Sequence, residues 1–122
     1  SKSDVPSTSS IILQFLPSGL CLPLALERPV VLGRIAVYED QGDEDHIDLS
    51  DLNALRHGIS RRHCLLRRLD NLILVRDLES TNGTVLNQEL LIAHEDYPIV
   101  HGDRLILGTL NIVIAFSTRP GA

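Results

Sequence analysis

Short apolar runs alternate with clusters of Gly, Pro, Ser, Asn and Asp along most of the chain. Runs of this length that end at turn-forming residues are typical of strands, whereas no stretch shows the sustained 3.6-residue period of a helix. The pattern predicts strands at 11–16, 20–27, 30–32, 64–69, 72–76, 89–92, 103–107 and 110–116. Many short strands with frequent turns predict an all-β fold, an antiparallel β-sandwich.

The first three predicted strands comprise a hairpin and a strand that leads into a polar loop. A turn cluster at 17–19 joins the first two, and Pro23 confines the second to a sheet edge or a bulge, because proline cannot donate a ladder hydrogen bond. The third strand ends at Gly33-Arg34. The position of Arg34 after a strand fixes its backbone, and its forked guanidinium can meet two phosphate oxygens at once.

A second hairpin is predicted where Asp70-Asn71 joins two apolar runs, since Asp and Asn tolerate the positive φ of a tight turn. The polar segments that flank this hairpin, 60–63 and 80–83, are then expected at one rim of the same sheet. These segments carry Ser60, Arg61, Arg62, Thr81 and Asn82. Hydroxyls, guanidiniums and an amide in one place form a site for an anion, most naturally a phosphate.

Four short motifs occur in order along the chain. They are Leu32-Gly33-Arg34, Ser60-Arg61-Arg62-His63, Ser80-Thr81-Asn82-Gly83-Thr84 with Asn87 after it, and Gly102-Asp103-Arg104-Leu105 continuing to Gly108. Together they resemble the motifs of forkhead-associated (FHA) domains over roughly residues 11–116. The resemblance implies a β-sandwich domain over 11–116 that binds phosphothreonine peptides through loops at one end. Residues 1–10, a disordered tail or an expression remnant, and 117–122 are expected to lie outside it.

The resemblance also implies roles for individual residues. Phosphate binding is expected from Arg34, Ser60, Arg61 and Thr81. Peptide binding is expected from Asn82, Arg62 and Asn87. Structural roles are expected for Gly33, His63 and Gly83. His63 is implied to tie the two recognition loops together by hydrogen bonds, and Gly83 to take a positive φ in a tight turn. The chain departs from the family at Gln88, because a glycine commonly follows this asparagine, and the conformation of that turn is therefore open.

The proximity of Ser60 and His63 in the sequence suggests a hydrolase as an alternative. The nucleophile-elbow pattern Gly-x-Ser-x-Gly is absent, and a catalytic triad needs an orienting carboxylate that sequence proximity does not supply. Glycine motifs of the P-loop and dinucleotide-binding types are absent as well. We therefore predict a binding module rather than an enzyme, with no catalytic residue, cofactor or metal. A scaffold or oligomerisation domain of the same fold, without phosphopeptide binding, is the second hypothesis.

The distribution of charge restricts which class of molecule the chain can bind. The 122 residues carry a formal net charge of −5, which argues against a general nucleic-acid binder. Lys2 is the only lysine, so every other formal positive charge is an arginine. No apolar run approaches the roughly 20 residues of a membrane span, and no secretory signal is visible. We predict a phosphothreonine-containing protein or peptide as the partner, neither nucleic acid nor membrane, and a cytoplasmic location.

Two further features concern the cysteines and the beginning of the chain. Cys21 and Cys64 lie in apolar runs and fit no zinc spacing, so both are predicted to be small buried hydrophobes. The chain has no methionine and is predicted to be a processed product or a domain of a longer signalling or secretion-linked protein. In some bacterial members of the resembled family an N-terminal phosphothreonine docks into the domain's own site. Thr8 makes the N-terminal tail a candidate ligand of this kind.

The segment 35–51 is crowded with acidic residues. They are Glu39, Asp40, Asp43, Glu44, Asp45, Asp48 and Asp51. We predict a solvated acidic loop, with steering of charged peptides as an additional role. Calcium binding is the alternative, but the Asp-x-Asp-x-Asp-Gly spacing of a calcium loop is absent. Residues 52–56 are predicted to form one helical turn capped by Asp51.

Overall fold

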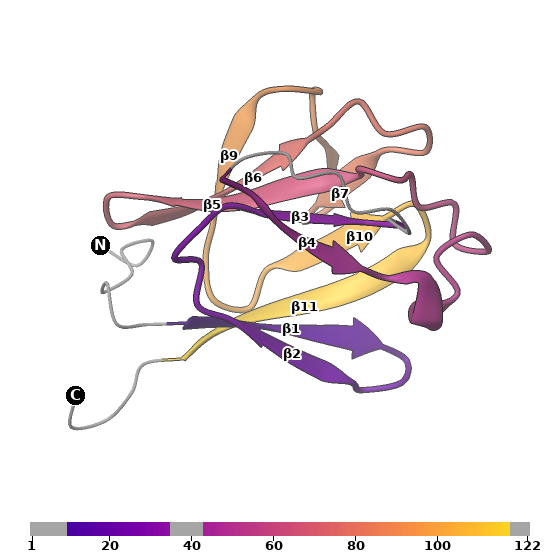
Figure 1. The fold of residues 1–122 in the computed structure, drawn as a ribbon, viewed down its shortest axis with the longest axis horizontal. Coiled ribbons are helices and arrows are strands. Elements are labelled where there is room, and N and C mark those ends of the chain that lie inside the picture. The colour runs from indigo at the N-terminus through magenta and orange to yellow at the C-terminus, as the bar shows by residue number, and fades with distance from the viewer. Residues whose placement is uncertain (1–9, 35–42, 118–122) are drawn as a thin grey trace.

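The computed structural model describes residues 10–34 and 43–117, which form eleven strands and one short 3₁₀ helix (Figure 1). In chain order the elements are β1 (Ser10–Leu16), β2 (Cys21–Leu24), β3 (Val30–Gly33), β4 (Asp45–Asp48), η1 (Ser50–Leu52), β5 (Cys64–Leu69), β6 (Leu72–Asp77), β7 (Thr84–Leu86), β8 (Glu89–Leu90), β9 (Asp96–Ile99), β10 (Arg104–Leu107) and β11 (Leu110–Ser117). Within these ranges, no helix has the length and apolar character needed to cross a membrane.

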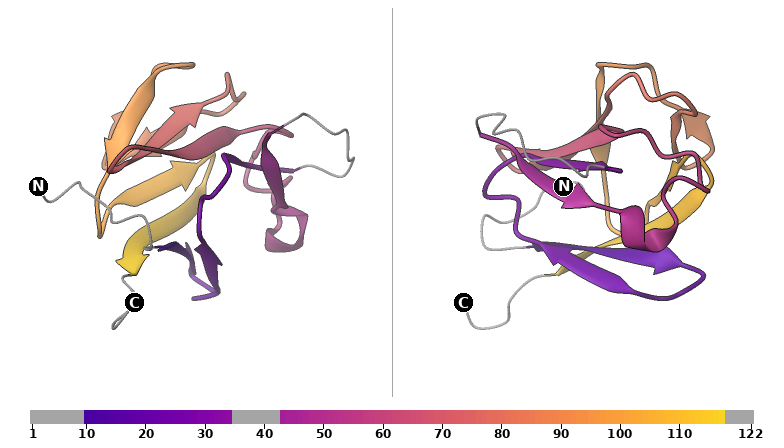
Figure 2. Two further views of the ribbon diagram at one scale, coloured as in Figure 1. Left: turned by 60° about the vertical axis from the view of Figure 1, so that its left-hand side comes forward. Right: turned by 45° about the vertical axis from the view of Figure 1, so that its right-hand side comes forward.

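The strands form two sheets that pack face to face (Figure 2). The six-stranded sheet has the order β2-β1-β11-β10-β7-β8, and the five-stranded sheet has the order β4-β3-β5-β6-β9. The predicted all-β sandwich is confirmed. Among the described strand pairs one departs from the antiparallel arrangement, because β4 runs parallel to β3.

The core lies between the sheets and follows the period-two alternation of the strands. On β1, Ile11, Leu13 and Phe15 are buried while the residues between them are half-buried. Leu32 of β3 and Leu66 of β5 face them from the other sheet and are fully buried. Aromatic residues make up only 3% of the sequence, so branched aliphatic side chains supply most of the apolar area that stabilises the fold.

The two cysteines differ in their surroundings. Cys64 is fully buried in the core, and this burial raises the pKa of its thiol, so the reactive thiolate is disfavoured. Cys21 is exposed, and the prediction that both cysteines are buried is wrong for it. Cys21 and Pro23 occupy the outward positions of β2, whose inward positions are filled by Leu22 and Leu24. β2 is an edge strand, as Pro23 predicted.

The acidic segment contains more structure than predicted. Residues 43–51 lie in the described part, and 45–48 of them form β4 rather than a loop. β4 needs little apolar content because it is an edge strand, and Ile47 alone packs against the core. The helical turn is the 3₁₀ helix η1, earlier than predicted, and Asp51 lies inside it rather than at its cap. Glu39, Asp40 and the N-terminal Thr8 lie outside the described residues.

Two other strands escaped prediction. Residues 96–99, outside the predicted strands, form the edge strand β9, whose Asp96 accepts hydrogen bonds from Arg76 and Arg67 at 2.7–3.0 Å. The three-residue strand β7 pairs with β10 and is too short to show a period. The hairpin of β5 and β6 forms as predicted, with Asp70 at φ 54°.

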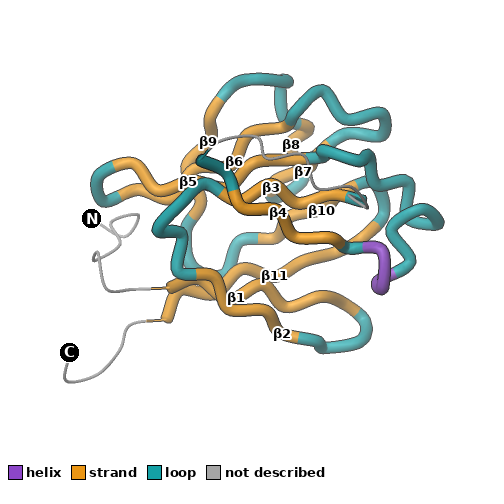
Figure 3. The backbone as a smooth tube through the Cα atoms, in the orientation of Figure 1, coloured by secondary structure: helices purple, strands orange, loops and turns teal. Residues whose placement is uncertain are grey.

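Several connections meet at one end of the sandwich. Figure 3 shows the segment between η1 and β5 and the segment between β6 and β7 at the same end. The β10–β11 turn also reaches this end, since the Thr109 N–H donates to the His57 carbonyl at 2.9 Å. These loops and the end of β3 form the candidate functional site.

Candidate functional site

The end of β3 places Arg34 against the segment that precedes β5. The Arg34 N–H donates to the Ser60 carbonyl at 3.0 Å, and its Nε donates to the Ile59 carbonyl at 3.2 Å. A Cβ on Gly33 would lie 1.9 Å from the Arg61 carbonyl oxygen, so only glycine lets the two segments approach this closely. These contacts hold the guanidinium by Nε and leave its two terminal nitrogens free of any described partner.

The Ser60 hydroxyl joins the two polar segments. Its oxygen accepts a hydrogen bond from the Thr81 N–H at 2.9 Å, across 21 residues of sequence. Because the hydroxyl oxygen is the acceptor in this contact, its own hydrogen remains available to donate to an anion. The prediction that 60–63 and 80–83 meet at one rim is confirmed.

His63 connects the same two loops from the interior of the domain. It is fully buried, and its Nδ1 accepts from the Ser60 N–H at 3.1 Å. Nε2 therefore carries the ring proton and donates to the Gly83 carbonyl at 2.8 Å. Both ring nitrogens are occupied by backbone groups, and the ring bonds the Ser60 amide rather than its hydroxyl. This geometry supports the structural role that the family resemblance implies for His63.

Asp77, at the end of β6, organises the second loop. Its side chain is buried with 4% exposure, and its carboxylate accepts from the Ser80 hydroxyl at 2.5 Å, the Ser80 N–H at 3.2 Å and the Thr84 hydroxyl at 2.6 Å. The Ser80 oxygen in turn accepts from the Gly83 N–H at 3.0 Å. Sequence reasoning missed Asp77, although Asp is among the residues that favour turns.

Asn82 lies at the surface beside the first loop. Its Nδ2 donates to the Gly58 carbonyl at 2.8 Å, and a Cβ on Gly58 would lie 2.4 Å from that nitrogen. The remaining amide hydrogen and the carbonyl oxygen of Asn82 have no partner among the described residues, so one donor and one acceptor stay available in one plane. Gly83 has φ +87°, as expected.

A third segment supports the first loop, a contact that was not predicted from the sequence. A Cβ on Gly108 would lie 2.1 Å from the His57 carbonyl oxygen. The Thr109 hydroxyl and the His57 Nδ1 lie 2.8 Å apart. The glycine of the final sequence motif therefore allows the β10–β11 turn to pack against the residues just before Gly58.

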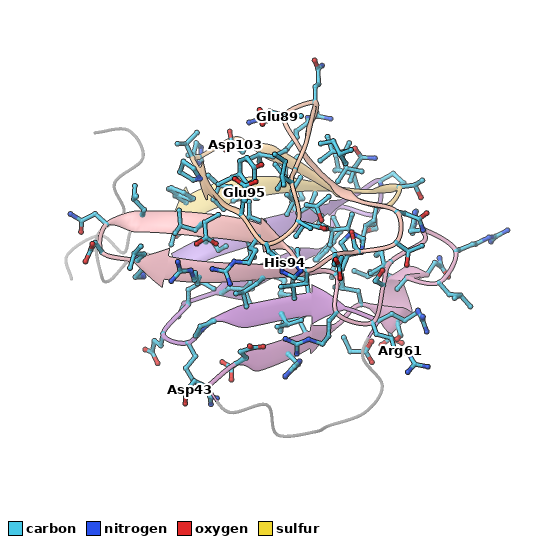
Figure 4. The ribbon with its side chains drawn as sticks, turned by 90° about the horizontal axis from the view of Figure 1, so that it is seen from above. Asp43, Arg61, Glu89, His94, Glu95 and Asp103 are labelled. Carbon is cyan, nitrogen blue, oxygen red and sulfur yellow. The ribbon has the colours of Figure 1, made fainter. Side chains whose placement is uncertain are left out.

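The remaining predicted residues lie in three different settings. Arg61 is exposed and projects from the loop (Figure 4). Arg62 is half-buried, and its Nη2 forms an ion pair with Glu44 at 2.9 Å. Asn87 lies away from the two loops. Its Nδ2 donates to the Asp103 carboxylate at 2.9 Å, and its Oδ1 accepts from the Arg104 N–H at 3.0 Å. Figure 4 shows Asp103 well separated from Arg61.

The turn after β7 forms despite the departure at Gln88. Asn87 has φ 49° and Gln88 has φ 73°, so both residues of this two-residue hairpin turn are left-handed. Gln88 thus takes a conformation that favours glycine. The hydrogen bonds between Asn87 and β10 fix this turn one strand length away from the loop of Asn82.

The buried imidazole predicts a pH dependence of stability. Burial lowers the pKa of His63 from its ordinary value of 6.5, so between these two pKa values the unfolded chain binds more protons than the folded one. We expect the free energy of unfolding to be insensitive to this group above pH 6.5 and to fall as the pH is lowered below it. Urea unfolding over roughly pH 5–8 measures this.

Two histidine variants separate this contribution from that of other groups. His63→Gln is expected to remove the dependence, whereas His94→Gln, at an exposed position, is expected to keep it. An unchanged slope in His63→Gln would assign the dependence to another residue.

The family model described as FHA domain matches residues 30–108. No curated protein matches the chain. A solved FHA domain of a hypothetical protein from Arabidopsis thaliana is 27% identical, with a TM-score of 0.72 and coverage of 100% of this chain and 98% of its own.

Two further solved structures are similar. A structure described as an analysis of phosphothreonine-dependent FHA domain interactions is 28% identical, with a TM-score of 0.64 and coverage of 91% of this chain and 98% of its own. The FHA domain of FhaA, complexed with the intracellular domain of Rv3910, is also 28% identical, with a TM-score of 0.62 and coverage of 86% and 99%.

Proposed function

Because this chain belongs to the FHA domain family, we propose that it recognises phosphothreonine in a peptide segment of a partner protein through the rim formed by Arg34, Ser60 and Thr81. The observation that carries the proposal is the contact between the Ser60 hydroxyl and the Thr81 N–H, with the Arg34 side chain anchored on the adjacent Ile59 carbonyl. The Ser60 hydroxyl hydrogen and the terminal nitrogens of Arg34 have no described partner, and the Arg34 N–H bonds the Ser60 carbonyl.

The chemistry of these groups suits a phosphate monoester. A phosphothreonine carries about −1.5 to −2 charges at pH 7 and offers three strong acceptor oxygens. Arg34 supplies a forked donor, Ser60 a hydroxyl, and the exposed Arg61 a further cation. Thr81 contributes its own hydroxyl from the facing loop. An unmodified threonine offers no charge to these donors, so discrimination by phosphorylation follows.

Asn82 is proposed to bind the peptide backbone. Its free amide hydrogen and carbonyl oxygen can donate to and accept from one extended residue, while its bond to the Gly58 carbonyl holds it in place. Arg62 and Asn87 have smaller parts in this proposal than the resemblance implied, because Glu44 and β10 already engage their side chains.

We also propose that this domain is part of a larger cytoplasmic signalling or secretion-linked protein. A kinase would phosphorylate the threonine that the domain recognises. Two of the similar structures support this, since their descriptions name phosphothreonine-dependent interactions and a complex with an intracellular domain. A scaffold without phosphopeptide binding is the alternative, and the free donors of Arg34 and Ser60 favour the binding module over it.

The proposal predicts selective binding to phosphorylated peptides. In a fluorescence-anisotropy titration, a degenerate phosphothreonine library is expected to bind at least about 10-fold more tightly than its unmodified counterpart, the effect of one charge-assisted hydrogen bond. A phosphoserine library tests whether the threonine methyl group matters. Equal binding of the phosphorylated and unmodified libraries by the folded domain would contradict the proposal and favour the scaffold.

A further inference from the structure

Beside the proposed phosphate site lies an open hollow of about 510 Å³. It is lined by Arg34, Ser50, Asn53, Ala54, Leu55 and Arg56. Two of these residues are cationic and none is acidic. Arg34 belongs both to this hollow and to the rim proposed to bind phosphate, so the two sites are continuous.

The two arginines of the hollow differ from four others in the described part of the chain. Arg28, Arg62, Arg67 and Arg76 each form an ion pair with a carboxylate at 2.7–3.4 Å. Arg34 and Arg56 form no ion pair with any residue in the described part of the chain. Two arginines without a carboxylate partner among the described residues therefore border one hollow.

No carboxylate among the described residues lines the hollow. Asp48 uses its Oδ1 to accept from the Ser50 N–H at 3.0 Å and from the Ser50 hydroxyl at 2.5 Å. Asp51 is exposed on η1 and does not line the hollow. Charge complementarity therefore favours an anionic occupant.

We infer that this hollow binds an acidic side chain of the same peptide, held by Arg56 together with Arg34, so that the preferred ligand is a phosphothreonine with an acidic residue nearby. The inference rests on the proposed function. A sphere of 510 Å³ is about 10 Å across, and an extended peptide rises about 3.3 Å per residue, so the acidic residue lies within about three residues of the phosphothreonine. Arg56 is then a specificity-determining residue.

An aspartate scan of one phosphopeptide tests this directly. The probe is a fluorescein-labelled phosphothreonine peptide in a Gly-Ser-Ala host, with a single Asp placed in turn at each of about three positions on either side. Each peptide is paired with one that carries the neutral isostere Asn. We expect Asp to exceed Asn by about fivefold in affinity at one or two positions, the upper range for an exposed ion pair. Added salt is expected to reduce this advantage.

Two charge-matched variants locate the effect. Arg56→Gln is expected to reduce the Asp advantage to less than about twofold, while the affinity for the peptide without Asp stays within about twofold of wild type. Arg104→Gln removes the same charge from an exposed position at the other end of β10 and is expected to keep the full advantage. Urea unfolding curves of both variants that match the wild-type curve establish that the fold is intact.

The outcomes separate the two levels of the proposal. Phosphorylation-dependent binding without any Asp advantage, or an advantage that persists in Arg56→Gln, overturns the acidic-residue site alone. A Leu peptide that binds better than every Asp peptide also overturns it and assigns the hollow to an apolar residue, through Leu55, which is 74% exposed. Binding that does not depend on phosphorylation overturns the proposed function together with this inference.

Discussion

Replacing Arg34 by alanine is expected to weaken binding of a phosphothreonine peptide by about 100-fold or more. Two charge-assisted hydrogen bonds from one guanidinium contribute about 3 kcal/mol or more in total, and this energy converts to that factor. The fold should change little, because the Arg34 N–H still donates to the Ser60 carbonyl and only the Nε contact to Ile59 is lost. Anisotropy titration and urea unfolding of the same preparation measure both quantities.

Arg104→Ala is the matched control for this variant. It removes an exposed arginine from the other end of β10 and is expected to leave phosphopeptide affinity within about twofold. Unchanged affinity in Arg34→Ala would exclude this guanidinium as the phosphate ligand. A large loss of stability would show instead that Arg34 supports the fold.

Replacing Asp77 by alanine is expected to lower the free energy of unfolding by about 3 kcal/mol and to abolish peptide binding as well. The change leaves the buried Thr84 hydroxyl and the half-buried Ser80 hydroxyl and N–H without their acceptor. An unsatisfied buried donor costs about 1–3 kcal/mol, and a half-buried one costs less. Peptide binding is lost because the same carboxylate shapes the loop that carries Thr81 and Asn82. Urea unfolding and anisotropy titration provide the two measurements.

Asp43→Ala is the control for Asp77→Ala, since Asp43 is exposed and its substitution is expected to change stability by no more than about 0.5 kcal/mol. Asp77→Asn separates charge from hydrogen bonding, because an amide keeps one acceptor oxygen in place. Wild-type stability in Asp77→Ala would contradict the role of this carboxylate as the organiser of the loop.

Much of the site could be predicted because its chemistry lies in short, contiguous polar segments. The hairpin of β5 and β6 returns both segments to one end of the sheet, so alternation and one turn signal sufficed to bring Ser60 and Thr81 together. The positive φ of Gly83 was also expected from the sequence motif. These features depend on nearby sequence rather than on the packing of the whole domain.

The parts that escaped prediction depend on tertiary contacts. The role of Asp77 needs the closing of a loop onto a buried carboxylate, and that of Gly108 needs the approach of two distant segments. β4 was hidden by its acidic composition, because its pairing with β3 uses backbone groups and only one apolar side chain. The ion pair of Arg62 with Glu44 depends on the position of that same strand.

The most direct test of the account maps the bound phosphate onto the domain by NMR. In a ¹H–¹⁵N titration with the tightest-binding phosphothreonine peptide, we expect the largest shifts at the Arg34 Nε–H and at the backbone amides of Arg61 and Thr81. Treatment with a phosphatase is expected to reverse them. Shifts concentrated instead around Arg67 and Arg76, on the five-stranded sheet, would contradict the account and place the ligand on another surface of the molecule.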